Sequence, residues 1–415
     1  MNTLWNKLWC VILTLALLIN LLPVSALAKN VQMEQMVVQH WVEDPPVGAT
    51  DETSQPLEIL SEDTSKRGEY YKEFVLSNGL RMASMYAEPV HYSEDGQWKE
   101  IDNTLKLASG AYTNTAGKWK VSFPQQLTKD KAVTITKDGY TLSFFMAGEL
   151  YRDTTNLTRA SLGTAAQEQP VQLQSFRTAT AQLQAMPQSE PEEDTLYPQA
   201  HAEKSHARLI YSNVSSGTDI VYDLKGNQVK ESIIIESYNA KLQGYRYTLN
   251  VGELNPVLTD SGEIQLYDRD NQKIVMVMPA PFLVDDSGEY CYDIALTLNG
   301  SGSQYTLTYH LPQQWLADTE RQWPVVLDPA VEADITRTNI RDVSVYEQNP
   351  PHNHNAGVLD VGHNTTYGVM RSFIKYQSLP ALTSSDVVVF ARLDLLKPND
   401  NSTSNPVEVH KVLNT

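Results

Sequence analysis

Cysteine is nearly absent from this sequence. The 415 residues include only two cysteines, Cys10 and Cys291. Cys10 lies in an apolar run near the amino terminus, and removal of that run would leave Cys291 without a partner. An exported protein of this size without a disulfide depends on a packed core for its stability. Cys291 lies in an alternating apolar and polar stretch, which predicts a buried thiol in a strand.

The sequence also lacks an apolar run long enough to cross a membrane. The longest one, Leu8–Leu22, has about 15 residues, fewer than the ~20 that a spanning helix needs. Lys7 precedes this run, Pro23 follows it, and small residues occupy the two positions that a signal peptidase requires. We therefore predict a signal peptide over residues 1–28, cleaved between Ala28 and Lys29, with an uncleaved anchor as the alternative. The mature chain, with no transmembrane segment, is expected to be secreted, extracellular or associated with the cell wall.

Positive charge is scarce. The sequence has 32 lysines and arginines against 50 aspartates and glutamates, which gives a formal net charge of −18 at pH 7. An acidic surface of this kind repels polyanions, so the composition argues against a nucleic-acid partner. The partners expected instead are cell-wall or extracellular glycans and downstream domains of the same polypeptide.

Motifs of enzyme chemistry are missing as well. The sequence contains no Gly-x-Ser-x-Gly elbow, phosphate-binding loop, His-Glu-x-x-His motif or dinucleotide fingerprint. The carboxylate pairs Glu100/Asp102 and Asp268/Asp270 fit a strand edge and a turn better than the paired acids of a glycosidase. The prediction is a protein that is not an enzyme, with no catalytic residue and no cofactor.

Alternation of apolar and polar residues is the strongest signal that is present. Lys72–Leu76 and Arg81–Tyr86, for example, flank the turn Ser77–Gly79, which is typical of an antiparallel hairpin. No helical periodicity extends beyond three turns. The predicted fold class is therefore all-β, with antiparallel sheets in β-sandwich or jelly-roll domains. The other predicted strand pairs are Val133–Thr136 with Tyr140–Phe144, Glu263–Leu266 with Lys273–Met278, and Tyr292–Leu298 with Tyr305–Leu311.

Composition divides the mature chain into segments. Residues 29–66 are rich in acids and proline and are predicted to be a disordered acidic linker. Residues 67–330 are predicted to form a β-rich amino-terminal domain that ends after the buried strand in Trp323–Pro329. Within it, residues 153–205 are rich in Gln, Ala and Thr and are predicted to be a mobile insertion, with at most a short helix around Val171–Met186. Residues 331–415 resume the strand pattern and end without a closing strand, which predicts a truncated module.

Short motifs along the first domain support a family resemblance. The sequence reads Glu69-Tyr-Tyr-Lys-Glu-Phe-Val-Leu-Ser-Asn-Gly-Leu80, continues through Asp95-Gly-Gln-Trp98, and ends on Trp323–Pro329. It resembles the amino-terminal region of secreted Rhs/YD-repeat and wall-associated proteins of Gram-positive bacteria. The resemblance implies a non-catalytic surface region for adhesion, carbohydrate binding or display of a downstream repeat or toxin region. An accessory region of an extracellular carbohydrate-active enzyme is the alternative.

The last segment carries a second resemblance. Asp342–Tyr346, Leu359–Gly362 and Arg371–Tyr376 are similar to the DNRLRE domain, a jelly-roll module often likened to carbohydrate-binding modules. The family-motif residues are Asp342, Asn355, Gly357, Gly362 and Arg371.

The motif residues suggest structural roles. The two glycines fit turns that need a positive φ, and Arg371 is expected to pair with Asp342 or Asp360. Asp342 and Asp360 are also weak candidates for a structural calcium site, because calcium prefers oxygen ligands. His352 and His354 lie in a Pro/Asn loop without further ligands at a suitable spacing, so a zinc site is not expected.

Overall fold

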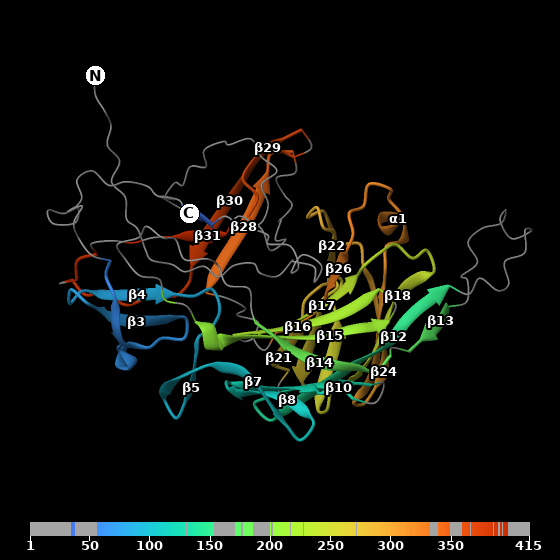
Figure 1. Cartoon of the computed structure of the whole chain (residues 1–415), viewed down its shortest axis with the longest axis horizontal. Coiled ribbons are helices and arrows are strands. Elements are labelled where there is room, and N and C mark those ends of the chain that lie inside the picture. The colour runs from blue at the N-terminus through green and yellow to red at the C-terminus, as the bar shows by residue number, and fades with distance from the viewer. Residues whose placement is uncertain are drawn as a thin grey trace, which may run out of the picture.

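A computed structural model of the chain shows sheets in nearly every described segment (Figure 1). The residues it describes are 35–37, 56–128, 131–152, 171–175, 177–185, 200, 202–215, 217–226, 228–270, 272–332, 339–348, 359–365, 367–384, 386–388, 391 and 393–396. The predicted signal peptide, with Ala28 and Lys29, lies outside them.

Two large antiparallel sheets form the main body. The first has twelve strands, and its main path follows the order β10, β14, β15, β16, β17, β27, β21, β20, β19. Their bounds are β10 (Gln126–Leu127), β14 (Ala179–Gln184), β15 (His206–Ser215), β16 (Thr218–Lys225), β17 (Gln228–Ile235), β27 (Ala330–Glu332), β21 (Ile274–Met278), β20 (Ile264–Asp268) and β19 (Leu254–Leu258), with β22 (Phe282–Val284), β23 (Tyr290–Cys291) and β26 (Val325–Asp328) paired off this path.

The second large sheet has nine strands and packs against the first. Its order is β24, β25, β18, β12, β11, β9, β8, β7, with β13 paired to β12. The bounds are β24 (Ala295–Ser301), β25 (Gln304–His310), β18 (Leu242–Asn250), β12 (Tyr140–Arg152), β11 (Val133–Lys137), β9 (Trp119–Pro124), β8 (Ala111–Ala116), β7 (Asp102–Ala108) and β13 (Val171–Gln174).

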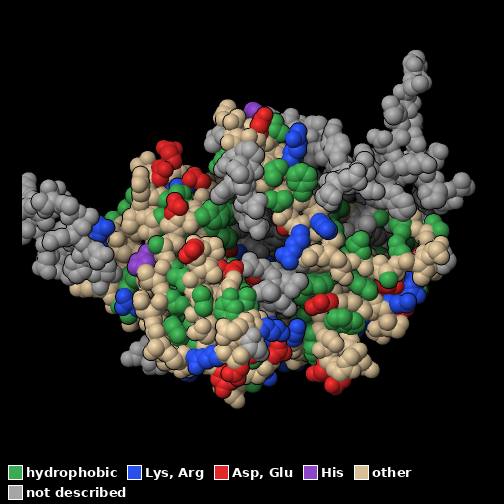
Figure 2. Space-filling model, turned by 180° about the vertical axis from the view of Figure 1, so that it is seen from behind, with side chains coloured by type: hydrophobic (Ala, Val, Ile, Leu, Met, Phe, Trp, Pro, Cys, Tyr) green, Lys and Arg blue, Asp and Glu red, His purple; other side chains and the backbone are tan. Residues whose placement is uncertain are grey.

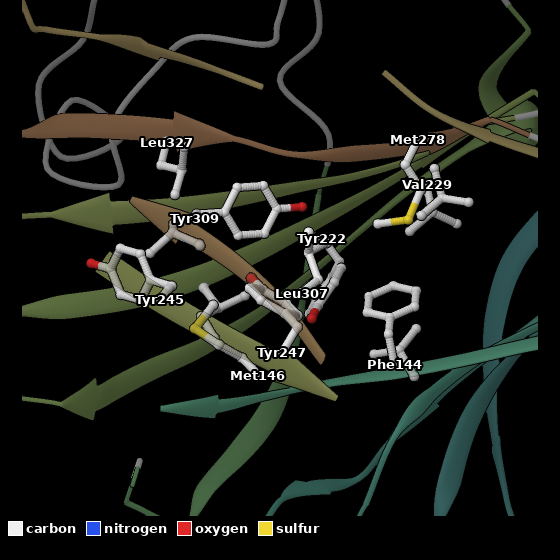
Figure 3. Close-up of a cluster of buried hydrophobic side chains, with 14 of the residues drawn as sticks. Phe144, Met146, Tyr222, Val229, Tyr245, Tyr247, Met278, Leu307, Tyr309 and Leu327 are labelled. Carbon is white, nitrogen blue, oxygen red and sulfur yellow. The ribbon is translucent and has the colours of Figure 1, made fainter. Parts of the chain in front are cut away.

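The inner faces of the two sheets form one hydrophobic core. Alternate residues of each strand point inward, as Ile220, Tyr222 and Leu224 do on β16. Figure 3 shows Tyr222 and Tyr247 among the apolar side chains between the sheets. The free thiol of Cys291 is buried in the same core, as its alternating context predicted, and burial raises its pKa.

Four smaller pairings and three short helices complete the described structure. The sheets are β2 (Ile59–Glu62), β3 (Tyr71–Leu76) and β4 (Arg81–Met85); β5 (His91–Glu94) and β6 (Gln97–Glu100); β28 (Ile340–Tyr346), β30 (Gly368–Tyr376) and β29 (Gly362–Asn364); and β1 (Gln35–Val37) with β31 (Asp394–Leu396). The helices are η2 (Thr64–Lys66), η4 (Glu203–Ser205) and α1 (Gln313–Leu316). Figure 1 shows β28 and β30 in the upper part of the molecule, above β16 and β17.

The predicted fold class is confirmed: the chain is all-β, its sheets are antiparallel, and two of them form a sandwich. The predicted hairpins are found as well. β3 pairs with β4, and Gly79 between them has a φ of +82°, which glycine adopts without strain. β11 pairs with β12, β20 with β21, and β24 with β25. Among the described residues, no helix is long and apolar enough to cross a membrane.

Part of the predicted mobile insertion is built into the sandwich instead. β13 and β14 both fall within residues 153–205, and β14 lies between β10 and β15. Ala179 and Ala181 of β14 are buried in the main core, so the prediction is wrong for this strand, as is the suggested helix around Val171–Met186. The small side chains gave a weak hydrophobic signal, although two alanines at alternate positions suffice where neighbouring strands supply the bulk of the packing.

The end of the predicted acidic linker is also folded. β2 pairs with β3, and Ile59 packs against Phe74 and Met82 in a small separate core. The guanidinium of Arg67 binds the carboxylate of Glu62, with 2.6 Å between Nε and Oε1. Acidic residues in this part of the chain therefore belong to an ordered strand with basic partners, contrary to the prediction of disorder.

Candidate binding surface and buried carboxyl groups

The described family-motif residues lie on or beside the three-stranded sheet of β28, β30 and β29. Asp342 is on β28, Arg371 is on β30, and Gly362 begins β29 with a φ of +136°. Asn355 and Gly357 lie outside the described residues. β30 is the central strand, so its side chains have a neighbouring strand on each side.

The register of this sheet separates its two faces. Asp342 is opposite Ile374 and Ser344 is opposite Ser372, so these side chains share the inward face. Tyr346 and Ile340 on the same face of β28 are buried. The intervening residues point to the other face, the outward face of the small sheet. They are Arg341, Val343 and Val345 on β28 and Arg371, Phe373 and Lys375 on β30.

Polar contacts fix the inward face. The hydroxyl of Tyr346 donates to the Asp360 carboxylate, and the amide N–H of Asp360 donates to Ser344 Oγ at 3.0 Å. Ser372 Oγ donates to the Asp360 carbonyl at 2.8 Å. Asp360 is therefore held by hydrogen bonds to both neighbouring strands.

The calcium prediction gains no ligand set from this geometry. Burial raises the pKa of Asp342, which weakens its capacity to stay ionised as a ligand. Within the described part of the chain, no three His, Cys, Asp or Glu side chains come together as a metal site. The calcium site at Asp342 and Asp360 stays an untested prediction.

Arg371 has a different environment from the one expected. It is opposite Val345 on the outward face, whereas Asp342 lies on the inward face and Asp360 accepts a hydrogen bond from Tyr346 there. The expected ion pair is therefore not formed, and Arg371 makes no ion pair with any described residue.

The outward face combines cations with apolar side chains. Arg341 is opposite Lys375, and Val343 is opposite Phe373, so that Arg371, Phe373 and Lys375 alternate along β30. The three cations are exposed, and 42% of the Phe373 surface is accessible. Figure 2 shows Lys and Arg side chains beside hydrophobic ones in the upper part of the rear face. This surface was not predicted from the sequence, although the alternation Arg371-x-Phe373-x-Lys375 is a signal that could have identified it.

Two cations on the twelve-stranded sheet are buried and paired with carboxylates. Arg208 of β15 binds Asp223 of β16 through two hydrogen bonds, of 2.6 and 2.7 Å. In the next position across the sheet, Lys230 of β17 forms an ion pair with Asp328 at 2.6 Å. Each of these four side chains is less than 10% exposed, so the pairs contribute to the folded state and are not available to a partner.

One carboxyl group lies inside the sandwich core. Glu231 of β17 accepts hydrogen bonds from the hydroxyls of Tyr222 and Tyr247, the latter at 2.7 Å. Burial, which disfavours the charged form, raises its pKa to about 7 although both tyrosines act in the opposite direction. Burial also raises the pKa of both tyrosines well above the usual value, so they remain donors at neutral pH.

A second core carboxyl is satisfied by hydroxyl groups. Glu149 of β12 accepts hydrogen bonds from Ser215 Oγ at 2.6 Å, Thr218 Oγ1 at 2.8 Å and Tyr151 Oη at 2.7 Å. Ser215 and Thr218 belong to the opposite sheet, so this carboxyl links the two layers of the sandwich. Glu149 and Glu231 are buried, and their contacts give them structural roles.

Known proteins similar to this chain carry the name of a nuclease. No family model matches the chain. It is 22% identical over 405 residues to the tRNA nuclease WapA of Bacillus subtilis (strain 168), and 22% identical over 408 residues to the tRNA3(Ser)-specific nuclease WapA of Bacillus spizizenii. The tRNA(Glu)-specific nuclease WapA of Bacillus subtilis subsp. natto is 22% identical over 404 residues. These alignments cover 90% of this chain, but only 15 to 16% of the relatives' length.

These names contradict two of the sequence-based predictions. A non-catalytic adhesion or display region was expected, with an accessory region of a carbohydrate-active enzyme as its alternative, whereas the relatives are enzymes. A nucleic-acid partner was also excluded, whereas the relatives act on tRNA. Net charge averages over the whole surface and does not detect cations gathered on one face. A search for short motifs does not detect a catalytic site whose side chains meet only in space.

Proposed function

We propose that this chain is part of an exported tRNA nuclease and that residues 102–332 contribute its β-sandwich. The observation that carries the proposal is the similarity along 90% of the chain to three proteins named as tRNA nucleases. Similarity of this extent is not confined to one short motif.

The proposal does not assign a particular tRNA. Two of the relatives are named for different tRNAs, one for serine and one for glutamate, yet the chain is equally similar to both. Any contribution of this segment to substrate binding is therefore expected to depend on features that all tRNAs share. The resemblance of residues 67–415 to Rhs-like proteins, and of residues 331–415 to the DNRLRE domain, remains a prediction.

Cleavage of tRNA by the native protein tests the proposal. Protein recovered from the culture medium or the cell surface is incubated with end-labelled tRNA(Ser) or tRNA(Glu), and the products are separated on a denaturing gel. Discrete fragments are expected, and heat-unfolded protein and duplex DNA serve as controls. Intact tRNA after incubation with excess protein would contradict the proposal.

Export is tested independently. Residues 1–28 have the charge and apolar pattern of a signal peptide. Amino-terminal sequencing of the extracellular protein is expected to begin at Lys29. A secreted form that begins at Met1 would show that the segment is not cleaved.

A further inference from the structure

The outward face of the small sheet has a charge that differs from the chain as a whole. Arg341, Arg371 and Lys375 are exposed there on two adjacent strands, in a chain of net charge −18. Side chains at alternate strand positions lie about 7 Å apart, so Phe373 has Arg371 on one side and Lys375, with Arg341 opposite it, on the other. His363 of β29 is opposite Val369 and extends this face.

The described carboxylates near the sheet form no ion pair with these cations. Asp342 and Asp360 belong to the inward face, as described above. Glu347 follows the end of β28, and its carboxylate accepts a hydrogen bond from the Val369 amide at 3.0 Å. Within the described residues, none of the three cations has an ion-pair partner.

We propose that the outward face of the small sheet binds single-stranded RNA, with the phosphates on Arg341, Arg371 and Lys375 and a base stacked on Phe373. This inference rests on the proposed function and names the surface that holds its substrate. A basic surface with an aromatic side chain at its centre is the arrangement by which sheet proteins bind unpaired nucleotides. The loops and 3′ end of a tRNA provide such nucleotides.

Phe373 distinguishes a single-stranded nucleic acid from polyanions that have no bases. A polymer without bases would interact with the cations alone and would leave the exposed ring in contact with water. Val343, opposite Phe373, widens the apolar area on which a base can lie. Stacking and phosphate contacts do not depend on sequence, in agreement with relatives that are named for different tRNAs. The acidic remainder of the surface would repel the strand and favour its approach to this face.

Fluorescence anisotropy with the full-length protein tests the assignment. The probe is a labelled, unstructured 2′-O-methyl dodecanucleotide, which resists ribonucleases, so binding is measured independently of cleavage. Three phosphate contacts predict that log K falls with log salt with a slope of about −2. The triple substitution of Arg341→Gln, Arg371→Gln and Lys375→Gln should abolish this slope and most of the binding. Phe373→Ala should weaken binding by about 5- to 150-fold at constant slope.

A matched control removes three cations from the sandwich. Lys106, Lys118 and Lys120 are exposed and have no ion-pair partner among the described residues. Their triple substitution by Gln changes the net charge equally and should leave most of the binding intact. A loss equal to that of the outward-face variant would overturn the site.

A competitor without bases tests the stacking. Inorganic polyphosphate of equal charge should compete weakly with the probe. If it competes as well as RNA, and Phe373→Ala binds as tightly as the parent protein, the surface binds anions in general and the RNA assignment is overturned. If the protein binds the probe but does not cleave tRNA, the proposed function is refuted and this site is not. If it cleaves tRNA but does not bind the probe, only this site is refuted.

Discussion

Two sheet faces of this molecule carry cations in opposite ways. On the twelve-stranded sheet, Arg208 and Lys230 are buried, and each is in contact with a carboxylate. On the small sheet, Arg341, Arg371 and Lys375 are exposed, and no described carboxylate is paired with them. A buried cation without a partner is strongly unfavourable, whereas an exposed one is hydrated at little cost. The same residue types therefore stabilise the fold in one place and remain available to a ligand in the other.

The largest expected effect is loss of a buried pair. Asp223→Ala would remove the carboxylate that accepts two hydrogen bonds from the buried Arg208 guanidinium. The loss of this ion pair should lower the free energy of unfolding by about 3–5 kcal/mol. Denaturant unfolding followed by circular dichroism measures the change. Asp260, exposed between β19 and β20, is the control, and Asp260→Ala should change stability by no more than about 0.5 kcal/mol. Equal effects of the two substitutions would show that the pair adds nothing.

The second prediction concerns Glu231, a buried acid with no cationic partner among the described residues. Burial raises the pKa of Glu231 from its ordinary value of 4.5 to about 7 in the folded protein. The folded state therefore binds more protons between these values, and the stability present below pH 4.5 is lost as pH rises through 7. The free energy of unfolding is expected to fall by about 3 kcal/mol by pH 8.

Glu231→Gln should remove this pH dependence. At pH 4.5 the variant is expected to be as stable as the parent protein or less stable. As the pH rises to 8, its stability should increase relative to that of the parent. Thermal unfolding at several pH values measures the difference. Glu149→Gln is the comparison, because Glu149 is also buried but accepts three hydrogen bonds from hydroxyl groups. A constant difference between parent and Glu231→Gln across this pH range would mean that Glu231 does not titrate there.

A smaller effect is expected on the inward face of the small sheet. Tyr346→Phe removes the hydrogen bond to Asp360 and should destabilise β28 and β30 by about 1–2 kcal/mol. Amide hydrogen exchange in these strands should accelerate about tenfold. Tyr238→Phe, at a side chain that is 45% exposed, should leave the same amides unchanged. Unaltered exchange in Tyr346→Phe would mean that other contacts hold the sheet.

The smallest effect is expected on the outward face. Arg371→Gln should change the free energy of unfolding by no more than about 0.5 kcal/mol, since the side chain is exposed and forms no ion pair with a described residue. Arg208→Gln, measured in parallel, should cost several kcal/mol. A similar loss in both variants would eliminate the difference between the two faces and show that Arg371 has a structural role.

Local pattern predicted the hairpins well. Between β3 and β4 and between β11 and β12, alternation and a glycine at the turn are sufficient signals, because both strands lie next to each other in sequence. β14 was missed because its partners, β10 and β15, lie elsewhere in the chain and supply the apolar bulk that its alanines lack. The calcium candidates and the pairing of Arg371 depended on which face each residue occupies. A shift of one position in the register moves each residue of a strand to the opposite face of the sheet. The sequence alone does not specify the register.

The sequence by itself determined the all-β class, because an alternating pattern is a property of each strand and needs no partner to be recognised. It also determined the acidic charge and the absence of a second cysteine after the first 28 residues. Only the tertiary structure decided which charges are neutralised. Whether a cation is buried beside a carboxylate, as Arg208 is, or exposed beside an aromatic ring, as Arg371 is, depends on strand pairing between distant segments. Charge composition sums over both kinds of cation, whereas folding separates them on different faces.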